Sequence, residues 1–239
     1  MRTVVITQPT YLPWLGYFRL MKEADVFVFL DNVQFERRSW QCRNRIKCPR
    51  KPIWLTVPTL HENQCLIKDV TIDNTKPWQR KHWKSIKSCY GKAPHFNTYA
   101  AFFEEVYNRR WVKLASLNIY IIKYLASQLG LSPTFIRSSR LGVGAKRTPL
   151  LLNICEMLNA DRYLSSIGAK QYMEEDGAKE LFGKAGIAVE FFEFNHPVYP
   201  QLFGEFISEL SVVDYLFNCG PDSRKVIFQE ASATFQPLS

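Results

Sequence analysis

The sequence predicts an α/β fold with a mostly parallel sheet of Rossmann-like type, flanked by helices and carrying a helical insertion. Two short apolar runs, at residues 4–6 and 26–30, have the length and composition of buried strands. Residues 16–23 between them can form one or two turns of helix, which gives a strand–helix–strand unit with the usual right-handed crossover. A second strand–helix–strand pattern spans residues 135–164.

The other elements follow from the spacing of apolar residues along the chain. Residues 53–57 and 187–194 are predicted strands, and residues 66–72 form a shorter, partly alternating one. Between about 76 and 130 the apolar residues recur at helical spacing, so this section is expected to be mainly helical. No repeat, low-complexity tract or linker divides the chain, and residues 1–239 are expected to form a single domain.

Composition narrows the class of protein without choosing a function. The chain has 239 residues, of which 46% are hydrophobic and 14% aromatic, and its formal net charge is +9 at pH 7. The charge fits either a scattered basic surface or an anionic partner such as a phosphate, a nucleotide sugar, a nucleic acid or a membrane surface. No apolar run approaches the roughly 18 residues of a membrane span, and no signal peptide precedes the first strand. A cytoplasmic protein with reduced thiols is therefore expected.

Polar and aromatic side chains follow the first two predicted strands, at the point where each strand ends. They are Gln8, Thr10, Tyr11, Trp14, Asp31, Asn32 and Gln34. In open parallel sheets, ligands sit at the carboxyl ends of the strands. We therefore expect Gln8, Tyr11, Asp31 and Gln34 to form one wall of the main pocket.

The segment 32–50 is rich in basic residues, and two interpretations of it stay open. It can be a solvated basic loop, or it can be a site in which the forked arginine side chains bind phosphate or carboxylate. The position of the segment just past the second strand favours the anion-binding site. The candidate binding residues in it are Arg38, Ser39, Arg43 and Asn44, and Trp40 among them can stack on a base or a sugar.

Four other candidates rest on weaker signals. Ser165 and Ser166 stand between a predicted strand and a predicted helix, where backbone N–H groups can face an anion. His82 lies on a predicted helix, and a lone histidine there is more often structural than catalytic. Gln201 belongs to a polar and aromatic motif near the end of the chain.

The cysteines and histidines form no recognisable metal site. No CxxC pair occurs and the four histidines are dispersed, so no zinc pattern fits and no metal is expected. Cys42 is a candidate nucleophile, because the neighbouring Arg43 and Arg45 can lower the pKa of a thiol.

Several blocks of the sequence, taken together, resemble the WbqC-like protein family. They are QPTYLPWLGYF, ADVFVFLDNVQF, RRSWQCRNRIK, WQRKHWKSIKSCYGKAPHF, ADRYLSSIGAKQYM and YPQLFGEFISELSVVDYLFNCG. The blocks extend over nearly all of the chain and in order. The chain departs from the family pattern at Cys42, where the family has Asn, and at Ser166, where it often has Gly. The resemblance implies a role in the assembly of bacterial surface polysaccharide, the O-antigen of lipopolysaccharide.

A weaker, architectural resemblance links the first strand and its loop to nucleotidyltransferases and pantothenate synthetase-like ligases. Their His-x-Gly-His motif corresponds in position to Trp14-Leu15-Gly16-Tyr17. The glycine is kept and both histidines are absent. Because those histidines contact the triphosphate, the resemblance favours the fold over adenylyl transfer.

The preferred hypothesis is a transferase that moves an acyl or aminoacyl group to an amino sugar, free or nucleotide-linked. Asp31 is the first choice for the base and His82 the second. The arginines would hold the phosphates of a nucleotide or of a CoA or carrier-protein thioester, and Tyr11 and Trp14 would stack on the ligand. Two alternatives stay open: a nucleotidyltransferase-like enzyme without the histidines, and a non-catalytic module that binds nucleotide sugars or nucleic acid.

Overall fold

A computed structural model describes residues 1–222 and 233–238 of the chain. The strands are β1 (Thr3–Thr7), β2 (Val26–Phe29), β3 (Arg43–Ile46), β4 (Ile53–Thr56), β5 (Thr59–Leu60), β6 (Thr71–Ile72), β7 (Thr134–Arg137), β8 (Arg162–Ser166), β9 (Ala188–Phe194) and β10 (Ala233–Pro237). The α-helices are α1 (Leu15–Met21), α2 (Trp78–Tyr90), α3 (Phe96–Asn108), α4 (Leu114–Gln128), α5 (Arg147–Met157), α6 (Lys170–Glu175), α7 (Ala178–Lys184) and α8 (Val212–Cys219). Short 3₁₀ turns are η1 (Ser138–Arg140), η2 (Ile167–Ala169) and η3 (Gly220–Asp222).

Six strands form the central sheet, in the order β10-β9-β8-β1-β2-β7. The pairs from β9 to β7 are all parallel, and β10 runs antiparallel to β9. The first strand lies in the interior of the sheet, where its apolar run is buried on both faces, as is typical of parallel sheets. The predicted α/β class with a mostly parallel, Rossmann-like sheet is confirmed.

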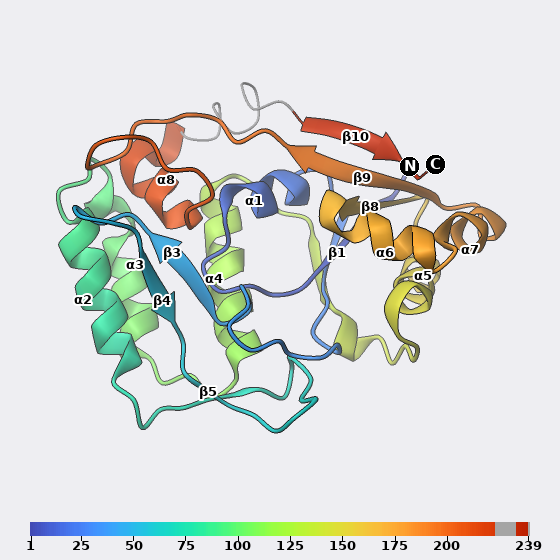
Figure 1. Ribbon diagram of the computed structural model, residues 1–239, viewed down its shortest axis with the longest axis horizontal. Helices are drawn as coiled ribbons and strands as arrows, with labels where there is room; N and C mark the ends of the chain where they lie inside the picture. Colours follow the sequence, from blue (N-terminus) through green and yellow to red (C-terminus); the bar gives the residue numbers. More distant parts are fainter. Residues whose placement is uncertain (223–232, 239) are drawn as a thin grey trace.

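The two faces of the sheet carry separate hydrophobic cores. Successive side chains of a strand point to opposite faces, so Val5 packs in the core with α1–α4 and α8, whereas Val4 and Ile6 pack with α5, α6 and α7. The same division is visible in Figure 1, where α5–α7 are grouped apart from α2–α4 and α8. The core on the face of the sheet that carries Val5 therefore extends into the helices between residues 78 and 128.

Two helix ends show how the local sequence sets the boundaries. Gly130 adopts a φ of 72° just after α4, and the N–H of Leu131 donates to the carbonyl of Ala126 at 2.9 Å, which closes the helix. The hydroxyl of Ser211 accepts a hydrogen bond from the N–H of Val213 and begins α8.

Three segments differ from the sequence-based expectation. The basic segment contains a strand, β3, which forms a hairpin with β4, because Asn44 and Ile46 alternate as buried residues with half-buried arginines. The strand predicted at 66–72 is reduced to β6. The sequence predicts no strand after 187–194, whereas β10 extends the sheet beside β9; residues 223–232 lie outside the described part. Among the described helices, none is both long and apolar enough to cross a membrane.

Candidate functional site

The order of the strands reverses beside β1. From β1 the chain adds β2 and then β7 on one side, after which it crosses over and adds β8 and β9 on the other. The segments that leave the carboxyl ends of β1 and β8 therefore diverge. In open α/β sheets, this switch point is where ligands bind.

A cavity of about 530 Å³ lies at this point, and we call it the switch-point cavity. Residues from the ends of β1 and β8, from β3 and β9 and from three loops line it. They include Thr7, Thr10, Trp14, Trp40, Asn44, Ser166, Phe192, Glu193, Phe194 and Glu209. Cavities of this size hold small-molecule ligands.

Buried amide groups fix the loop between β1 and α1 beside the cavity. Asn118 on α4 donates from Nδ2 to the carbonyls of Pro9 and Gln41, at 2.9 and 2.8 Å. Asn44 donates from Nδ2 to the carbonyl of Leu12 at 2.6 Å, and Leu12 itself has a φ of 47°. A non-glycine residue keeps such a backbone conformation only where its surroundings impose it. The loop is therefore a positioned part of the cavity.

The indole ring of Trp14 forms an aromatic wall of the cavity. Its centroid lies 5.7 Å from that of Phe194, edge to face, and 6.4 Å from that of His196, nearly parallel. Gly16 leaves the room for this ring, because a Cβ atom at position 16 would lie 2.3 Å from the indole. The glycine of the Trp-Leu-Gly-Tyr motif thus serves the packing of its tryptophan.

The lining of the cavity is acidic. Glu193 and Glu209 line it, and among the described residues no lysine or arginine does. The carboxylate of Glu193 already accepts a hydrogen bond from Nε2 of Gln236 on β10, at 3.1 Å. Asn44 and Ser166 add neutral polar groups. Carboxylates pair with ammonium groups and accept hydrogen bonds from hydroxyls. The lining consequently suits a ligand with amine and hydroxyl groups better than an anion.

The imidazole ring of His196 packs against Trp14 and Phe194, next to the cavity. Its Nδ1 is 2.9 Å from the carbonyl of Pro197. A proton on Nδ1 donates there, which assigns Nε2 as the acceptor. Burial lowers the pKa of His196 below its ordinary value of 6.5, so the ring is neutral near pH 7. Sequence reasoning missed this residue, although it follows the carboxyl end of β9 by two positions.

Trp40 connects the cavity to an exposed aromatic pair. Trp40 and Trp54 are 48% and 44% exposed, and their ring centroids lie 5.5 Å apart. The guanidinium carbon of Arg43 lies 4.3 Å from the centroid of Trp54. We call Trp40, Trp54 and Arg43 the tryptophan rim. Large aromatic faces beside an arginine suit a ring-shaped, negatively charged ligand.

Comparison with known proteins identifies the family. The model of the WbqC-like protein family matches residues 8–226. The chain belongs to this family. This WbqC-like protein is also similar to a protein of Mycobacterium tuberculosis that is named "Uncharacterized protein Rv1507c". The two are 32% identical over 230 residues, which cover 93% of this chain and 96% of the mycobacterial one. No solved structure matches the chain.

The structure brings three of the site residues predicted for this WbqC-like protein into the cavity: Trp14, Asn44 and Ser166. Gln8, Tyr11, Asp31 and Gln34, the expected pocket wall, do not line it. The physical reason is the reversal of strand order, which opens the sheet between β1 and β8, whereas the expectation placed the pocket between β1 and β2. The amide of Gln8 instead accepts a hydrogen bond from Gln41 Nε2 at 2.8 Å. Gln34 is exposed and bridges to Leu66.

Asp31 is completely buried and is engaged by the last residue of β7 and by the two serines that follow it. Its carboxylate accepts from Nε of Arg137 at 2.6 Å, from the N–H and hydroxyl of Ser139 at 2.9 and 3.0 Å, and from the hydroxyl of Ser138 at 3.2 Å. Nη2 of Arg137 forms an ion pair with it at 2.6 Å. The predicted catalytic role of Asp31 stays a prediction, but the geometry is that of a residue that orients an arginine.

His82 and Tyr11 belong to a buried chain of hydrogen bonds in the core. The hydroxyl of Tyr11 lies 2.8 Å from Nδ1 of His82 and 2.7 Å from the hydroxyl of Tyr107. Burial lowers the pKa of His82 to about 4. Neither residue lines the switch-point cavity, so the catalytic role predicted for His82 and the stacking role predicted for Tyr11 stay predictions.

The remaining predicted binding residues are spread over the surroundings of the cavity. Arg38 is exposed, with a φ of 58°, and the hydroxyl of Ser39 donates to the carbonyl of Glu36 at 2.8 Å. Ser165 is buried, and its hydroxyl accepts from that of Tyr163 at 3.2 Å.

Gln201 belongs to a second buried polar network. The ammonium of the buried Lys47 donates to Gln201 Oε1 at 3.0 Å. Nearby, the carboxylate of Asp214 accepts hydrogen bonds from the hydroxyls of Tyr90 and Tyr199, both at 2.8 Å. Burial raises the pKa of Asp214.

One expectation about the cysteines is wrong. Cys48 and Cys89 form a disulfide, with their Cα atoms 4.9 Å apart, so not all six thiols are reduced. Burial raises the pKa of the Cys42 thiol despite the lowering by Arg43, and a nucleophilic role for Cys42 stays a prediction. Among the described residues, no group of three or more His, Cys, Asp or Glu side chains is placed to hold a metal ion.

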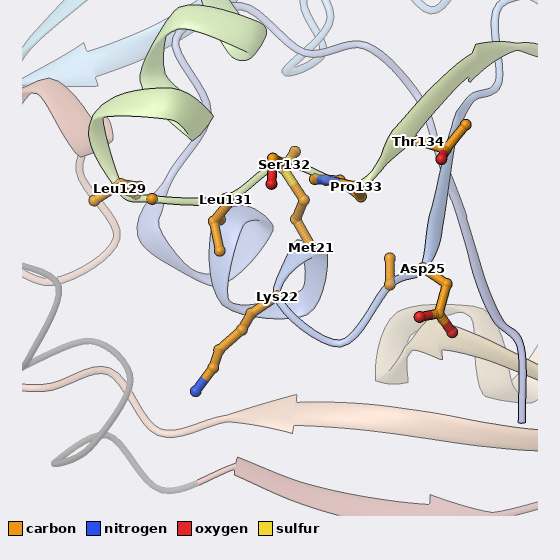
Figure 2. Close-up of a pocket in the computed structure, with 10 residues that line it drawn as sticks. Met21, Lys22, Asp25, Leu129, Leu131, Ser132, Pro133 and Thr134 are labelled. Atoms are coloured by element: carbon orange, nitrogen blue, oxygen red, sulfur yellow. The ribbon is translucent and has the colours of Figure 1, made fainter.

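Another cavity, of about 520 Å³, lies at the opposite edge of the sheet, where β2 and β7 begin. Figure 2 shows Lys22 and Asp25 there, with their charged groups pointing in different directions. Because ligands of open α/β sheets bind at the carboxyl ends of the strands, we do not place the site there.

Proposed function

We propose that this WbqC-like protein is a transferase that moves an acyl or aminoacyl group to a nucleotide-linked amino sugar. The role of the product in bacterial surface polysaccharide rests on the family resemblance. One observation supports the substrate class: the cavity at the switch point is lined by aromatic residues and by Glu193 and Glu209, and by no lysine or arginine among the described residues.

The sugar would lie in the switch-point cavity. The C–H face of a pyranose ring packs well against an aromatic ring, a role for which Trp14 is placed. Glu193 and Glu209 would accept hydrogen bonds from the amine and the hydroxyls. The same acidic lining disfavours a triphosphate in this cavity, which argues against the nucleotidyltransferase alternative.

The nucleotide would lie on the tryptophan rim. Trp40 belongs to both the cavity and the rim, so a ligand can extend from one to the other. The base would stack on an exposed indole, and Arg43 would contact the diphosphate.

We propose His196 as the base: it stands beside the cavity, against Trp14 and Phe194, and is not itself one of the lining residues. In the transfer step, the amine nitrogen attacks the acyl carbonyl of a thioester donor. The C–N bond forms, the C–S bond breaks, the amine proton passes to Nε2 of His196, and the proton then passes to the leaving thiolate. Its burial-lowered pKa keeps the ring neutral and available near pH 7.

The binding experiment compares UDP-glucosamine with UDP-glucose by isothermal titration calorimetry. UDP-glucosamine should bind about tenfold more tightly than UDP-glucose, because one additional charge-assisted hydrogen bond changes an affinity by about that factor. Glu209→Gln and Glu193→Gln should each reduce this preference. Glu180→Gln, on the far side of the sheet in α7, is the matched control and should preserve it. Equal affinity of the wild-type protein for the two nucleotide sugars would refute the assignment.

A further inference from the structure

A second cavity at the carboxyl edge of the sheet has the opposite charge. It measures about 450 Å³ and lies between α4 and the ends of β2 and β7. Lys123, Arg137 and Arg140 line it, and no carboxylate does among the described residues. We call it the α4–β7 cavity.

The three cations come from three different elements. Lys123 projects from α4, Arg137 ends β7 and Arg140 belongs to η1. Lys123 and Arg140 are exposed, so their charges are accessible to a ligand. Their convergence on one hollow brings Lys123 together with two arginines that lie 14 and 17 positions further along the chain.

Asp31 orients the central cation of the three. Its carboxylate engages Nε and Nη2 of Arg137 and is itself held by Ser138 and Ser139. Asp31 is inaccessible to solvent, whereas Arg137 is 25% exposed. The guanidinium is therefore fixed in one orientation, and its Nη1 group is not used by Asp31. A pre-oriented arginine loses less entropy when it binds phosphate.

The rest of the lining is aromatic and apolar. Phe135 lies under the ammonium of Lys123, whose Nζ is 5.3 Å from the ring centroid. Trp111 and Tyr120 form the other wall, with ring centroids 5.1 Å apart. Outside the lining, Arg109 lies 4.5 Å from the Trp111 ring, and Glu105 accepts from the hydroxyl of Tyr120 at 2.9 Å. An anionic group with an apolar or ring-shaped portion fits these surroundings.

We propose that the α4–β7 cavity binds the phosphate groups of a phosphorylated small molecule, with Lys123, Arg137 and Arg140 as the phosphate ligands. Asp31 is a positioning residue in this site. The proposal does not depend on the proposed function, because a different cavity and different residues carry it.

Isothermal titration calorimetry with inorganic pyrophosphate, ADP and CoA tests the proposal on the full-length protein. Lys123→Gln and Arg140→Gln should each weaken binding roughly tenfold, the value of one charge-assisted hydrogen bond. Both side chains are exposed, so these variants keep the fold. Lys179→Gln removes the same charge from α7, beyond the other face of the sheet, and should have little effect.

The three probes also distinguish the sources of the phosphate. Similar affinity for all three probes identifies a site that recognises phosphate alone. Tighter binding of ADP and CoA than of pyrophosphate shows that the site also recognises the nucleoside. Tighter binding of CoA than of ADP shows that it also recognises the pantetheine arm. The proposal is overturned if none of the probes binds at concentrations up to about 10 mM. It is overturned equally if Lys179→Gln weakens binding as much as Lys123→Gln, since that identifies diffuse attraction to a basic protein.

Discussion

The indole of Trp14 occupies the space that any side chain at position 16 would need, because a Cβ on Gly16 would lie 2.3 Å from the ring. Trp14, just before α1, and Gly16, in the first turn of α1, thus determine the aromatic wall of the switch-point cavity. The ring can stay where it is only while position 16 is glycine.

Gly16→Ala should displace the indole and weaken the binding of a nucleotide sugar by about tenfold, or 1.4 kcal/mol. Near-ultraviolet circular dichroism would report the change in tryptophan environment, and calorimetry the loss of affinity. Gly183→Ala is the control, since a Cβ there meets nothing within 4 Å and the residue lies in α7. That variant should be as stable as wild type or more so, by about 0.5 kcal/mol. Unchanged circular dichroism and affinity in Gly16→Ala would contradict the packing argument.

Asp31→Asn separates the positioning role of Asp31 from the catalytic role expected from the sequence. Loss of the buried charge leaves Arg137 with a weaker partner, and the free energy of unfolding should fall by roughly 3 kcal/mol. Urea denaturation measures this, with Glu174→Gln as the control, because its carboxylate is 4.0 Å from the ammonium of Lys170 at the surface and contributes little. Full stability combined with abolished turnover would instead support Asp31 as the base.

The pH dependence of stability should report His82. Burial lowers the pKa of His82 to about 4 in the folded protein, against an ordinary value of 6.5. Between pH 4 and 6.5 the unfolded chain binds more protons than the folded protein does. The contribution of neutral His82 to the free energy of unfolding is therefore fully present above pH 6.5 and is lost as the pH falls toward 4. The loss is roughly 3 kcal/mol over the window. Urea denaturation at several pH values measures it, and His82→Asn should flatten the dependence; an equally steep dependence in the variant would assign it to other groups.

Thiol titration of the unfolded, unreduced protein should find four free cysteines, Cys42, Cys65, Cys155 and Cys219. The disulfide closes a loop with a sequence separation of 41, so its reduction should lower the free energy of unfolding by about 4 kcal/mol in the chain-entropy model. A thermal melt with and without reductant measures the change, and Cys65→Ser provides a variant without effect on the disulfide. Six free thiols in the unreduced protein would contradict the pairing.

The fold could be predicted largely from local pattern, whereas the site could not. The runs at residues 4–6 and 26–30 predict strands because a short apolar run is a local signal. The switch point depends on which side of β1 receives β8, and that is fixed by the crossover of a distant segment. Trp14, Asn44 and Ser166 were selected because they are polar or aromatic near strand ends. Glu193, Glu209 and His196 were missed because nothing near them in the sequence shows that β9 and the segment after it lie beside the first loop.

A crystal structure of the protein with UDP-glucosamine tests the central claim most directly. The account predicts that the sugar lies in the switch-point cavity, with its amine about 3 Å from a carboxylate oxygen of Glu193 or Glu209 and its ring against Trp14. The base of the nucleotide should lie on the tryptophan rim. A sugar bound elsewhere, with the switch-point cavity filled only by water, would contradict the account.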